Sequence, residues 1–422
     1  MSFSRLLTPF ASRNYRLFFG GQIISLIGSW MTTTATVWLV YSLTGSPLWL
    51  GLVALTGQLP AILLSPFAGV WVDRLPRLKL LAVTQVASMV QSLLLAGFTL
   101  TGHINIWILT SLSIVQGIIT AFDLPTRQSL PVLLVEKREH LAGLIGMNAS
   151  MFNLARLVGP AIGGMVIAAW GTGFCFLIDG LSYLAVLAAL AFMRVNAAPP
   201  APRTNSVWGE MKLGFRYAFG SLPLATHILF PCLMGIFGLS YAVLIPVYAS
   251  HVFGGDARTL GWLMSSSAAG AVLAALYLAG RRELRGIGHV ILFGALIAGI
   301  TLILFAFSRN QWLSMACLLF TGLGSILVMA ANNTLVQNLV EEDKRGRVMS
   351  LYAMGFTGGM PLGALLTGTV ADWTNITIAT CLNGLACIVM GLVFARMLPA
   401  LRREARPMLE RSGAITPLEI RQ

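Results

Sequence analysis

Two charged residues interrupt long apolar stretches of this sequence, Arg156 within 146–169 and Asp179 within 173–193. A charge at the centre of a membrane helix costs about 2.5 to 3.5 kcal/mol on insertion scales, so such residues usually have a purpose. A buried carboxylate can take up a proton, and a guanidinium can tune the pKa of that carboxylate or hold a substrate. We predict that Asp179 and Arg156 are coupling residues, the alternative being a fixed polar contact that orients two helices. Asp179 is the one obvious carboxylate in the expected membrane core.

Helical spacing puts each of these charges on a polar stripe. Asn153 lies three residues before Arg156, and Asp179 is followed by Ser182 and Tyr183 at three and four residues. Residues at these spacings share one helix face, so both stripes are predicted to face protein or a cavity and not lipid. At 1.5 Å per residue the depths of the two charges differ by about 12 Å, so we expect a water link and not a direct ion pair.

Small residues and prolines form a second type of pattern in two apolar stretches, where the small residues recur at every fourth position. Glycine lets helix backbones approach closely, and proline frees a carbonyl group and can bend the helix. We expect seams at which two helix bundles rock on each other, although static packing would explain the glycines too. The seam candidates are Ala155, Gly159, Pro160, Gly163 and Gly164 in one stretch, and Gly355, Gly359, Pro361 and Gly363 in the other.

Polar and aromatic side chains within the apolar stretches are candidates for lining a substrate cavity. Amides and hydroxyls can bind a substrate, although cross-helix hydrogen bonding is their commoner role. Aromatic rings can stack on flat or lipophilic molecules, with core packing as the alternative. The cavity candidates are Gln22, Ser29, Trp30, Thr33, Gln58, Gln116, Asn153, Tyr241, Asn332 and Phe356.

Several kinds of chemistry lack the residues that they require. The five histidines are scattered without ligand spacing, and the five cysteines form no CxxC pair, so we expect no metal site and no cofactor. No GxSxG motif, HExxH motif or G-x-x-x-x-G-K-[ST] phosphate loop occurs. These absences disfavour a membrane enzyme and an ATP-driven pump, and no catalytic residue is predicted.

The elements that must position these candidates are apolar stretches of about twenty residues, the length at which a helix crosses about 30 Å of hydrocarbon. The sequence is 56% hydrophobic and 10% charged, with a mean hydropathy of +0.80, which is not the composition of a soluble protein. We predict an all-α integral membrane protein with twelve transmembrane helices and no removable signal peptide. The predicted spans are 15–41, 48–70, 79–101, 106–122, 146–169, 173–193, 224–249, 260–279, 287–307, 311–331, 347–371 and 375–397.

The positive charges predict the orientation of these spans. All but three of the 28 lysines and arginines fall in the amino-terminal segment, in alternate loops and in the carboxy-terminal segment. By the positive-inside rule this side is cytoplasmic. We expect a multi-pass protein of the cell (cytoplasmic) membrane with both termini in the cytoplasm. The net charge of +13 is then a topology signal and predicts no nucleic-acid partner.

Weak internal similarity links the two halves of the chain. The dipeptide LG at 50 recurs at 260, and LVEKRE at 134–139 has a counterpart in LVEEDK at 339–344. Such repeats indicate a membrane fold built from two six-helix units. The expected domains are an N-terminal bundle at 1–193, a linker with an amphipathic helix at 194–223, a C-terminal bundle at 224–397 and a cytoplasmic tail at 398–422.

The loop between the second and third spans carries Gly69, Asp73, Arg74 and Arg77. Their spacing resembles the G-x-x-x-D-R-x-x-R signature of the major facilitator superfamily. The segment ARLVGPAIGG at 155–164 resembles the G-x-x-x-G-P-x-x-G-G motif of exporters in that superfamily that exchange substrate for protons. Other stretches, such as AFDLPTRQSLP at 121–131, are similar to enterobactin-exporter-like proteins, and the resemblance covers essentially the whole chain.

This resemblance implies two six-helix pseudo-repeat bundles that work as a secondary active transporter. The implied activity is proton-coupled efflux of small amphipathic or lipophilic molecules by alternating access. Asp73 can accept hydrogen bonds from a helix amino end, and Arg74 and Arg77 can bind carboxylates or helix carboxyl ends, so these residues form an expected inner gate. The alternative is that the charges of this loop only set the orientation of the protein in the membrane. Ser113 stands where many proton-coupled drug exporters carry an arginine, so that coupling role is not transferred to this position.

Alternatives remain within and outside this class. A siderophore or metabolite exporter and a lysophospholipid transporter would share the fold, a membrane enzyme is disfavoured as above, and a channel would lack alternating access. The expected partners are a small-molecule substrate, protons as the coupling ion and the lipid bilayer. The sequence leaves the substrate identity and the oligomeric state open.

Overall fold

The computed structural model describes residues 8–72, 75–133, 141–193, 207–281, 286–342 and 344–411. The secondary structure of these ranges is helical, without strands. Twelve helical segments within them are long and apolar enough to cross a membrane. This finding confirms the predicted all-α class and the predicted number of spans.

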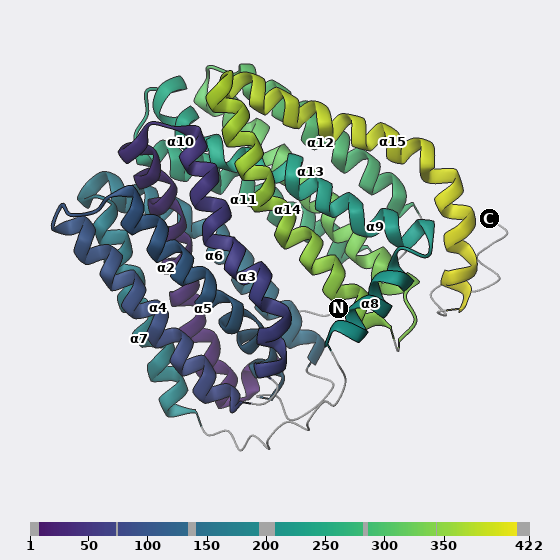
Figure 1. The fold of residues 1–422 in the computed structure, drawn as a ribbon, viewed down its shortest axis with the longest axis horizontal. Coiled ribbons are helices and arrows are strands. Elements are labelled where there is room, and N and C mark those ends of the chain that lie inside the picture. The colour runs from purple at the N-terminus through teal and green to yellow at the C-terminus, as the bar shows by residue number, and fades with distance from the viewer. Residues whose placement is uncertain are drawn as a thin grey trace. The chain divides into compact units, whose positions relative to one another are not determined.

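The first six membrane helices pair mostly with helices that are not their neighbours in sequence (Figure 1). They are α2 (Arg13–Thr44), α3 (Pro47–Val72), α4 (Arg77–Leu100), α5 (Ile106–Leu133), α6 (Leu141–Trp170) and α7 (Thr172–Phe192). Helix α2 packs on α6 and α7, helix α4 packs on α5 and α7, and helix α3 packs on α5. Local signals set the ends of α2, because the Ser12 side chain accepts a hydrogen bond from the Tyr15 backbone and Gly45 adopts a left-handed φ of 63°.

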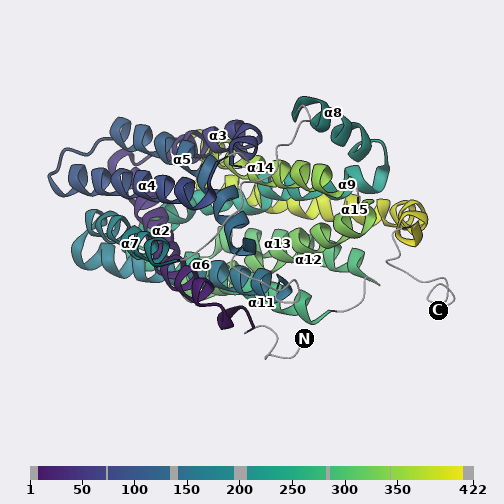
Figure 2. The same ribbon diagram turned by 90° about the horizontal axis from the view of Figure 1, so that it is seen from below.

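The second half begins with a short amphipathic helix, α8 (Val207–Ala218), which turns into the seventh span (Figure 2). Helix α12 packs on α13 and α15, and helix α14 packs on α9 and on α15. The helices after α8 are α9 (Leu222–Leu233), α11 (Ala257–Gly280), α12 (Ile287–Phe307), α13 (Gln311–Leu339), α14 (Arg345–Trp373) and α15 (Ile376–Arg411), with the irregular part of the seventh span between α9 and α11.

The seventh span, Leu222–Val252, is not a regular α-helix along its whole length. A π-helical segment follows α9 at Met234–Leu239. A 3₁₀ segment (Ser240–Leu244), the short α10 (Ile245–Val247) and a second π-helical segment (Tyr248–Val252) complete the span. Pro231 and Pro246 supply no backbone N–H group, so the regular hydrogen-bond ladder cannot run through this stretch. Such π-helical turns are frequent at functional sites.

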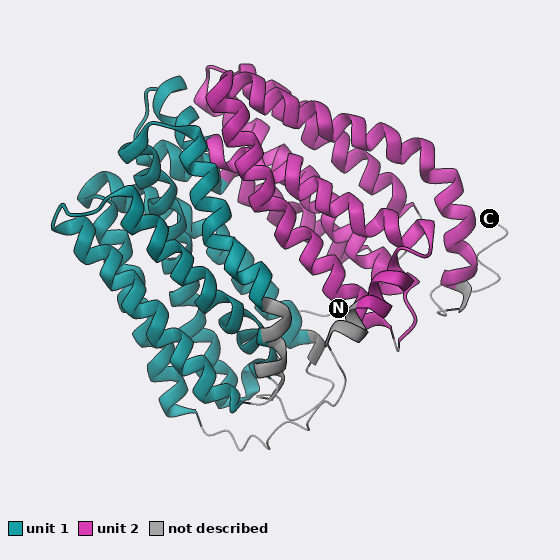
Figure 3. Cartoon of the chain, in the orientation of Figure 1, with its two compact units in different colours: residues 1–203, 245–265 teal, residues 204–244, 266–422 magenta. Residues whose placement is uncertain are grey.

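Contacts divide the chain into two compact units (Figure 3). Unit 1 contains residues 1–203 and 245–265, and unit 2 contains residues 204–244 and 266–422. The segment 245–265 holds the end of the irregular span and the start of α11, so this part of the second sequence half belongs to unit 1. The predicted domains were continuous segments, whereas the contact units are not.

Several helix ends differ from the predicted ones, and the two largest differences lie at the carboxyl ends of α5 and α15. Helix α5 continues to Leu133, although the fourth span was expected to end at 122, and α15 continues to Arg411 past the expected end at 397. The prolines of both extensions lie inside the helices, at Pro125 and Pro131 in α5. Proline is tolerated in membrane helices because neighbouring groups bind the freed carbonyls, so proline alone did not mark a helix end here.

Candidate functional site

Asp179 lies at the meeting point of three helices of unit 1. It belongs to α7, and its side chain is buried, with 2% of the residue exposed. Ser29 and Thr32 of α2 donate hydrogen bonds of 3.4 and 3.0 Å to its carboxylate. Ser92 of α4 donates a third bond of 3.0 Å. As the polar stripe predicted, Asp179 faces protein, and three hydroxyl groups from two other helices surround it.

A glycine of α2 makes this arrangement possible. A Cβ atom added at Gly28 would lie 2.9 Å from the Asp179 carboxylate and 2.8 Å from the Ser182 hydroxyl. Real Cβ atoms do not approach other atoms so closely, so the backbone of α2 passes directly over the carboxylate of α7. Tyr183 closes the same side, with its hydroxyl 3.5 Å from that of Ser29. The site therefore depends on close packing of α2 and α7.

The donors to Asp179 are neutral. The ion pairs found between described residues join Asp123 to Arg127, Asp256 to Arg258 and Glu341 to Lys344, and none of them includes Asp179. A buried carboxylate usually has a cationic partner, or it changes protonation state. Hydroxyl groups can donate to the carboxylate and can turn to accept from the carboxylic acid, so this site can hold Asp179 in either state.

Arg156, the second coupling candidate, has a different environment. Its guanidinium carbon lies 5.9 Å from the ring centroid of Trp30 on α2, within the range of a cation–π interaction. Phe152 approaches the same ring edge-on, with ring centroids 5.8 Å apart. Arg156 and Trp30 are half-buried and Phe152 is exposed. The structure thus brings Arg156 to an aromatic surface and not to Asp179, in agreement with the expectation that the two charges form no direct pair.

A second buried carboxylate, Asp123 on α5, was missed by the sequence analysis. Only 6% of this residue is exposed. Thr84 and Gln85 of α4 donate hydrogen bonds of 2.9 and 2.7 Å to one carboxylate oxygen. Arg127, one turn further along α5, donates to the other oxygen and completes an ion pair. The prediction that Asp179 was the one obvious carboxylate of the core is therefore wrong.

Asp123 was not predicted to be buried because the predicted end of the fourth span, at residue 122, was placed too early. With the span ending at 122, Asp123 and Arg127 were assigned to a cytoplasmic loop. One sequence signal was available, because Asp123 and Arg127 have the i, i+4 spacing of an ion pair on a continuous helix. Pro125 and Pro131 obscured that signal, since proline normally argues against helix continuation.

The small residues of α6 contact two different helices. Gly159 and Gly163 face α2, where an added Cβ would collide with Trp30 and approach the Met31 backbone to 3.1 Å, respectively. Gly164, one position later, faces α11, and an added Cβ would collide with the Ala257 carbonyl and lie 3.1 Å from Gly261. Ala155 is buried in the apolar cluster of α2 and α6.

Pro160 takes part in the α11 contact, because its carbonyl would lie 2.5 Å from a Cβ added at Gly261. The every-fourth-residue stripe thus packs α6 onto α2 inside unit 1, and the adjacent position meets α11. The expectation that these residues form a seam between two rocking bundles stays a prediction. A one-residue step turns a helix face by about 100°, so neighbouring glycines can serve different partners.

The corresponding residues of α14 pack inside unit 2. Cβ atoms added at Gly359 and Gly363 would collide with the seventh span, at the backbones of Cys232 and Ile236. Gly355 is less restricted, because the nearest atom, the Cys232 Cβ, would be 3.6 Å away. Pro361 is buried in the same helix. This stripe too joins helices of a single unit.

Two cavity candidates of unit 2 are buried and already paired with side chains. The Tyr241 hydroxyl lies 2.7 Å from that of Ser267, and Asn332 accepts at 2.7 Å from His227 Nδ1 when that nitrogen carries the proton. Ser240 of the irregular span lies 2.9 Å from the Thr367 hydroxyl, which in turn accepts from Asn383 at 3.0 Å. These contacts fasten the seventh span to α11, α13, α14 and α15.

The remaining cavity candidates divide by exposure. Thr33 and Gln58 are exposed, Ser29, Asn153 and Phe356 are half-buried, and Gln22 is completely buried. The Asn153 side chain donates to the Ala149 carbonyl of its own helix at 2.9 Å. Gln116 of α5 is half-buried and donates to Ser88 of α4 at 3.4 Å. Neither Gln22 nor Gln116 therefore offers its side chain freely to a substrate.

The expected inner gate lies mostly outside the described residues. Asp73 and Arg74 are not described, whereas Gly69 belongs to the last turns of α3 and Arg77 is the first residue of α4. Gly69 and Arg77 thus lie on the two helices that flank the expected gate, and the gate itself stays a prediction.

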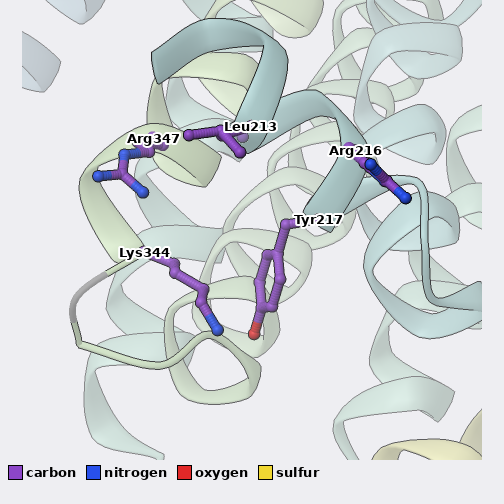
Figure 4. A pocket seen from close by; sticks show the side chains of 6 residues that line it. Leu213, Arg216, Tyr217, Lys344 and Arg347 are labelled. Carbon is purple, nitrogen blue, oxygen red and sulfur yellow. The ribbon is translucent and has the colours of Figure 1, made fainter. Parts of the chain in front are cut away.

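A pocket of about 370 Å³ lies between α8 and the start of α14 (Figure 4). Lys344 lies 4.6 Å from the Tyr217 ring centroid and 2.5 Å from Glu341. Figure 4 shows Arg216 pointing away from Lys344 and Arg347, so the three cations do not converge on one point. We interpret this pocket as the place where the linker helix is fastened to α14. Within the described ranges, no group of three or more His, Cys, Asp or Glu side chains could hold a metal ion.

The described residues form twelve candidate membrane helices in two compact units, with the carboxylates Asp123 and Asp179 buried inside helices of unit 1. This architecture is that of a polytopic membrane transporter. The family described as transmembrane secretion effector matches residues 4–413. The chain therefore belongs to this exporter family of the major facilitator superfamily.

Similar proteins support this membership. The staphyloferrin A transporter of Staphylococcus aureus is 26% identical over 382 residues, which cover 90% of this chain and 95% of that protein. The multidrug efflux pump Tap of Mycolicibacterium fortuitum is 24% identical over 89% of this chain and 93% of its own length. Macrolide efflux protein A of Streptococcus pyogenes is also 24% identical, over 88% of this chain and 93% of its own length.

Solved structures show the same fold at low sequence identity. The nucleoside transporter NupG covers 90% of this chain with 98% of its own, at a TM-score of 0.70 and 15% identity. A POT family transporter in complex with 5-aminolevulinic acid covers 92% of this chain with 97% of its own, at a TM-score of 0.71 and 13% identity. These similarities concern the fold alone.

Proposed function

We propose that this protein exports small amphipathic or lipophilic molecules in exchange for protons, by alternating access. The observation that carries the proposal is Asp179, a buried carboxylate held by hydroxyl groups of α2 and α4. The names of the relatives, which include multidrug and macrolide efflux proteins, support export as the direction. The chain then works in the cell membrane, with both termini in the cytoplasm.

Proton uptake by Asp179 changes the contact between α2 and α7. The carboxylate accepts from Ser29, Thr32 and Ser92, whereas the carboxylic acid also donates one hydrogen bond, so one of these three hydroxyls turns to accept it. Because Gly28 holds the two backbones in close contact, a change in these bonds acts directly on α2. Helix α2 also carries Trp30, which links the proton site to the aromatic surface.

We propose that Trp30, Phe152 and Arg156 form the part of unit 1 that binds substrate. Two aromatic rings with centroids 5.8 Å apart offer an apolar surface, and the guanidinium above Trp30 adds a positive charge. That charge favours a second candidate, the export of an anionic metabolite such as a siderophore. An Arg156→Gln variant decides between them, because it should lose transport of an anionic siderophore and keep transport of a neutral drug. Equal loss of both would mean that Arg156 does not select cargo charge.

The coupling role of Asp179 is tested by Asp179→Asn in proteoliposomes with an imposed pH gradient and a radiolabelled macrolide. The amide keeps the shape of the side chain and cannot titrate, so the variant should bind the macrolide and lose gradient-driven export. Asp256→Asn is the matched control, because this carboxylate is exposed. Full gradient-driven export by Asp179→Asn would exclude Asp179 as the coupling acid. Non-saturable flux that ignores the gradient would point to a channel.

We also propose that Asp73, Arg74 and Arg77 close the cytoplasmic side. Each charge-assisted hydrogen bond of such a gate is worth about 1.5 to 3 kcal/mol. Asp73→Asn and Arg77→Ala should therefore leave an inserted protein with poor transport. Normal flux in both variants would reduce the loop to a topology signal.

A further inference from the structure

Unit 1 contains buried polar side chains that no hydrogen bond explains. Gln22 and Ser25 of α2 are 0% exposed, and neither polar atom of Gln22 nor the Ser25 hydroxyl has a partner among the described residues. Gln85 of α4 is also 0% exposed, and its amide oxygen has no partner there. Buried polar groups in folded proteins are nearly always paired, with protein or with ordered water. The unpaired groups on α2 and α4 therefore indicate places that bind water.

These side chains continue two polar stripes that lead to Asp179. On α2, Ser25 lies seven residues before Thr32, which donates to Asp179. On α4, Gln85 lies seven residues before Ser92, which also donates to Asp179. At 1.5 Å per residue, Ser25 and Gln85 both lie about 10 Å from the level of Asp179, toward the side predicted to be cytoplasmic.

Asp123 marks the far end of the α4 stripe. Gln85 and Thr84 donate to its carboxylate, and Ser88, one turn further, accepts from Gln116. The stripe of Thr84, Ser88 and Ser92, at four-residue spacing, thus runs from one buried carboxylate to the other. All of these α4 residues are buried.

Among the described residues, Arg127 on its own helix is the ion-pair partner of Asp123. Helix α4 presents neutral side chains to Asp123 through Thr84 and Gln85. The same helix donates to Asp179 through Ser92. Side chains of α4 therefore bind both buried carboxylates.

We propose that Asp123 is a second proton site and that a hydrated polar column, defined by Gln22, Ser25, Gln85 and Ser88, carries protons from Asp179 to Asp123 and onward toward the cytoplasmic side. This proposal rests on the proposed proton-coupled export. A proton leaves the carboxylic acid of Asp179, passes along water and hydroxyl groups, and ends on the carboxylate of Asp123. Asp179 is then an anion again, Asp123 is neutral, and Arg127 loses its anionic partner until Asp123 releases the proton toward the cytoplasm.

Static packing makes the opposite prediction for the unpaired groups. If Gln22 and Ser25 only fill space, replacing them by apolar side chains of similar shape removes unpaired groups, so the protein becomes more stable and export is unchanged. If they bind the water of a proton path, the same replacement slows the proton-coupled step. The Gln22→Met, Ser25→Ala double variant separates these outcomes and changes no ligand of Asp123 or Asp179.

The experiment uses the full chain in proteoliposomes, with a pH-sensitive dye inside and a radiolabelled macrolide as substrate. Two activities are measured, export driven by a pH gradient and macrolide exchange without a gradient. We expect Asp123→Asn to lower gradient-driven export by about a hundredfold, the scale of one proton-transfer group, with exchange preserved. The Gln22→Met, Ser25→Ala double variant should also show decreased gradient-driven export. The midpoint temperature of its thermal unfolding should be equal to or above that of the wild type.

Ser314→Ala is the matched control, because Ser314 is also 0% exposed with an unpaired hydroxyl but lies in unit 2. It should keep both activities. If Asp123→Asn does not fold, the double variant alone decides. Normal gradient-driven export by the double variant, together with loss in Asp179→Asn, would overturn the column and leave the proposed function intact. Absence of gradient-driven export in the wild type would overturn both.

Discussion

The polar interiors of the two units differ in chemistry, although weak internal similarity links the two halves of the sequence. In unit 1, Asp123 and Asp179 are buried within membrane helices. In unit 2, the buried polar side chains among the described residues are hydroxyls, amides and one histidine, with no aspartate or glutamate. Burial of a titratable acid costs free energy that an amide network does not require. We infer that the proton-handling part of the cycle resides in unit 1, and that the polar groups of unit 2 hold the irregular seventh span in place.

Among substitutions that test whether unit 1 handles protons, Gly28→Leu is expected to have the largest effect on gradient-driven export. An added side chain would collide with Asp179 and Ser182, so we expect gradient-driven export to fall to background. Gly20→Leu is the matched control on the same helix, because no atom lies within 4 Å of a Cβ added at Gly20. Export assays on both variants, with membrane insertion measured by fractionation, test this difference. Normal export by Gly28→Leu would show that the α2 contact with Asp179 is not required.

A large effect on cycling is also expected at the contact of α6 with α11. Gly164→Leu places bulk against Ala257 and Gly261, and overpacking of this kind costs about 1 to 3 kcal/mol. We expect slow exchange of a labelled macrolide with normal insertion. Gly355→Ala is the control in unit 2, since its nearest neighbour would be 3.6 Å away, within normal van der Waals contact. If Gly164→Leu exchanges macrolide normally, this contact does not move during transport.

A smaller and different effect is expected for the polar network of unit 2. Asn383→Ala leaves the Ser240 and Thr367 hydroxyls with one partner fewer, so the free energy of unfolding should fall by about 1 to 3 kcal/mol. The ratio of protons to macrolide transported should not change. Thermal unfolding in detergent and dye-based proton counting measure the two quantities. A changed ratio would contradict the assignment of proton handling to unit 1.

The smallest expected effect is at His227, the buried histidine of unit 2. His227→Gln can keep a hydrogen bond to Asn332, so both stability and export should stay close to the wild type. His227→Leu should lower stability by about 1 to 3 kcal/mol, because it leaves the Asn332 oxygen unpaired. Loss of gradient-driven export in the glutamine variant would show that unit 2 also contains a proton-handling residue.

The class of this protein could be predicted from its amino-acid sequence alone. Apolar stretches of about twenty residues predicted all twelve spans, because no other element can satisfy its backbone groups in hydrocarbon. Periodicity predicted that Asp179, Ser182 and Tyr183 face protein, since a polar stripe cannot face lipid without a cost in free energy. The amphipathic helix of the linker was likewise readable, and it is α8.

Only the tertiary structure decided which residues meet. Asp123 is buried because α4 supplies Thr84 and Gln85 at the right depth, and the sequence of α5 contains no information on that neighbour. Residue 28 must be glycine because the Asp179 side chain, 151 residues later in the sequence, lies against it. Gly163 and Gly164 are adjacent in the sequence, but Gly163 packs against α2 and Gly164 packs against α11. Periodicity fixes the face of one helix, whereas the partner of that face depends on the packing of all the helices in the unit.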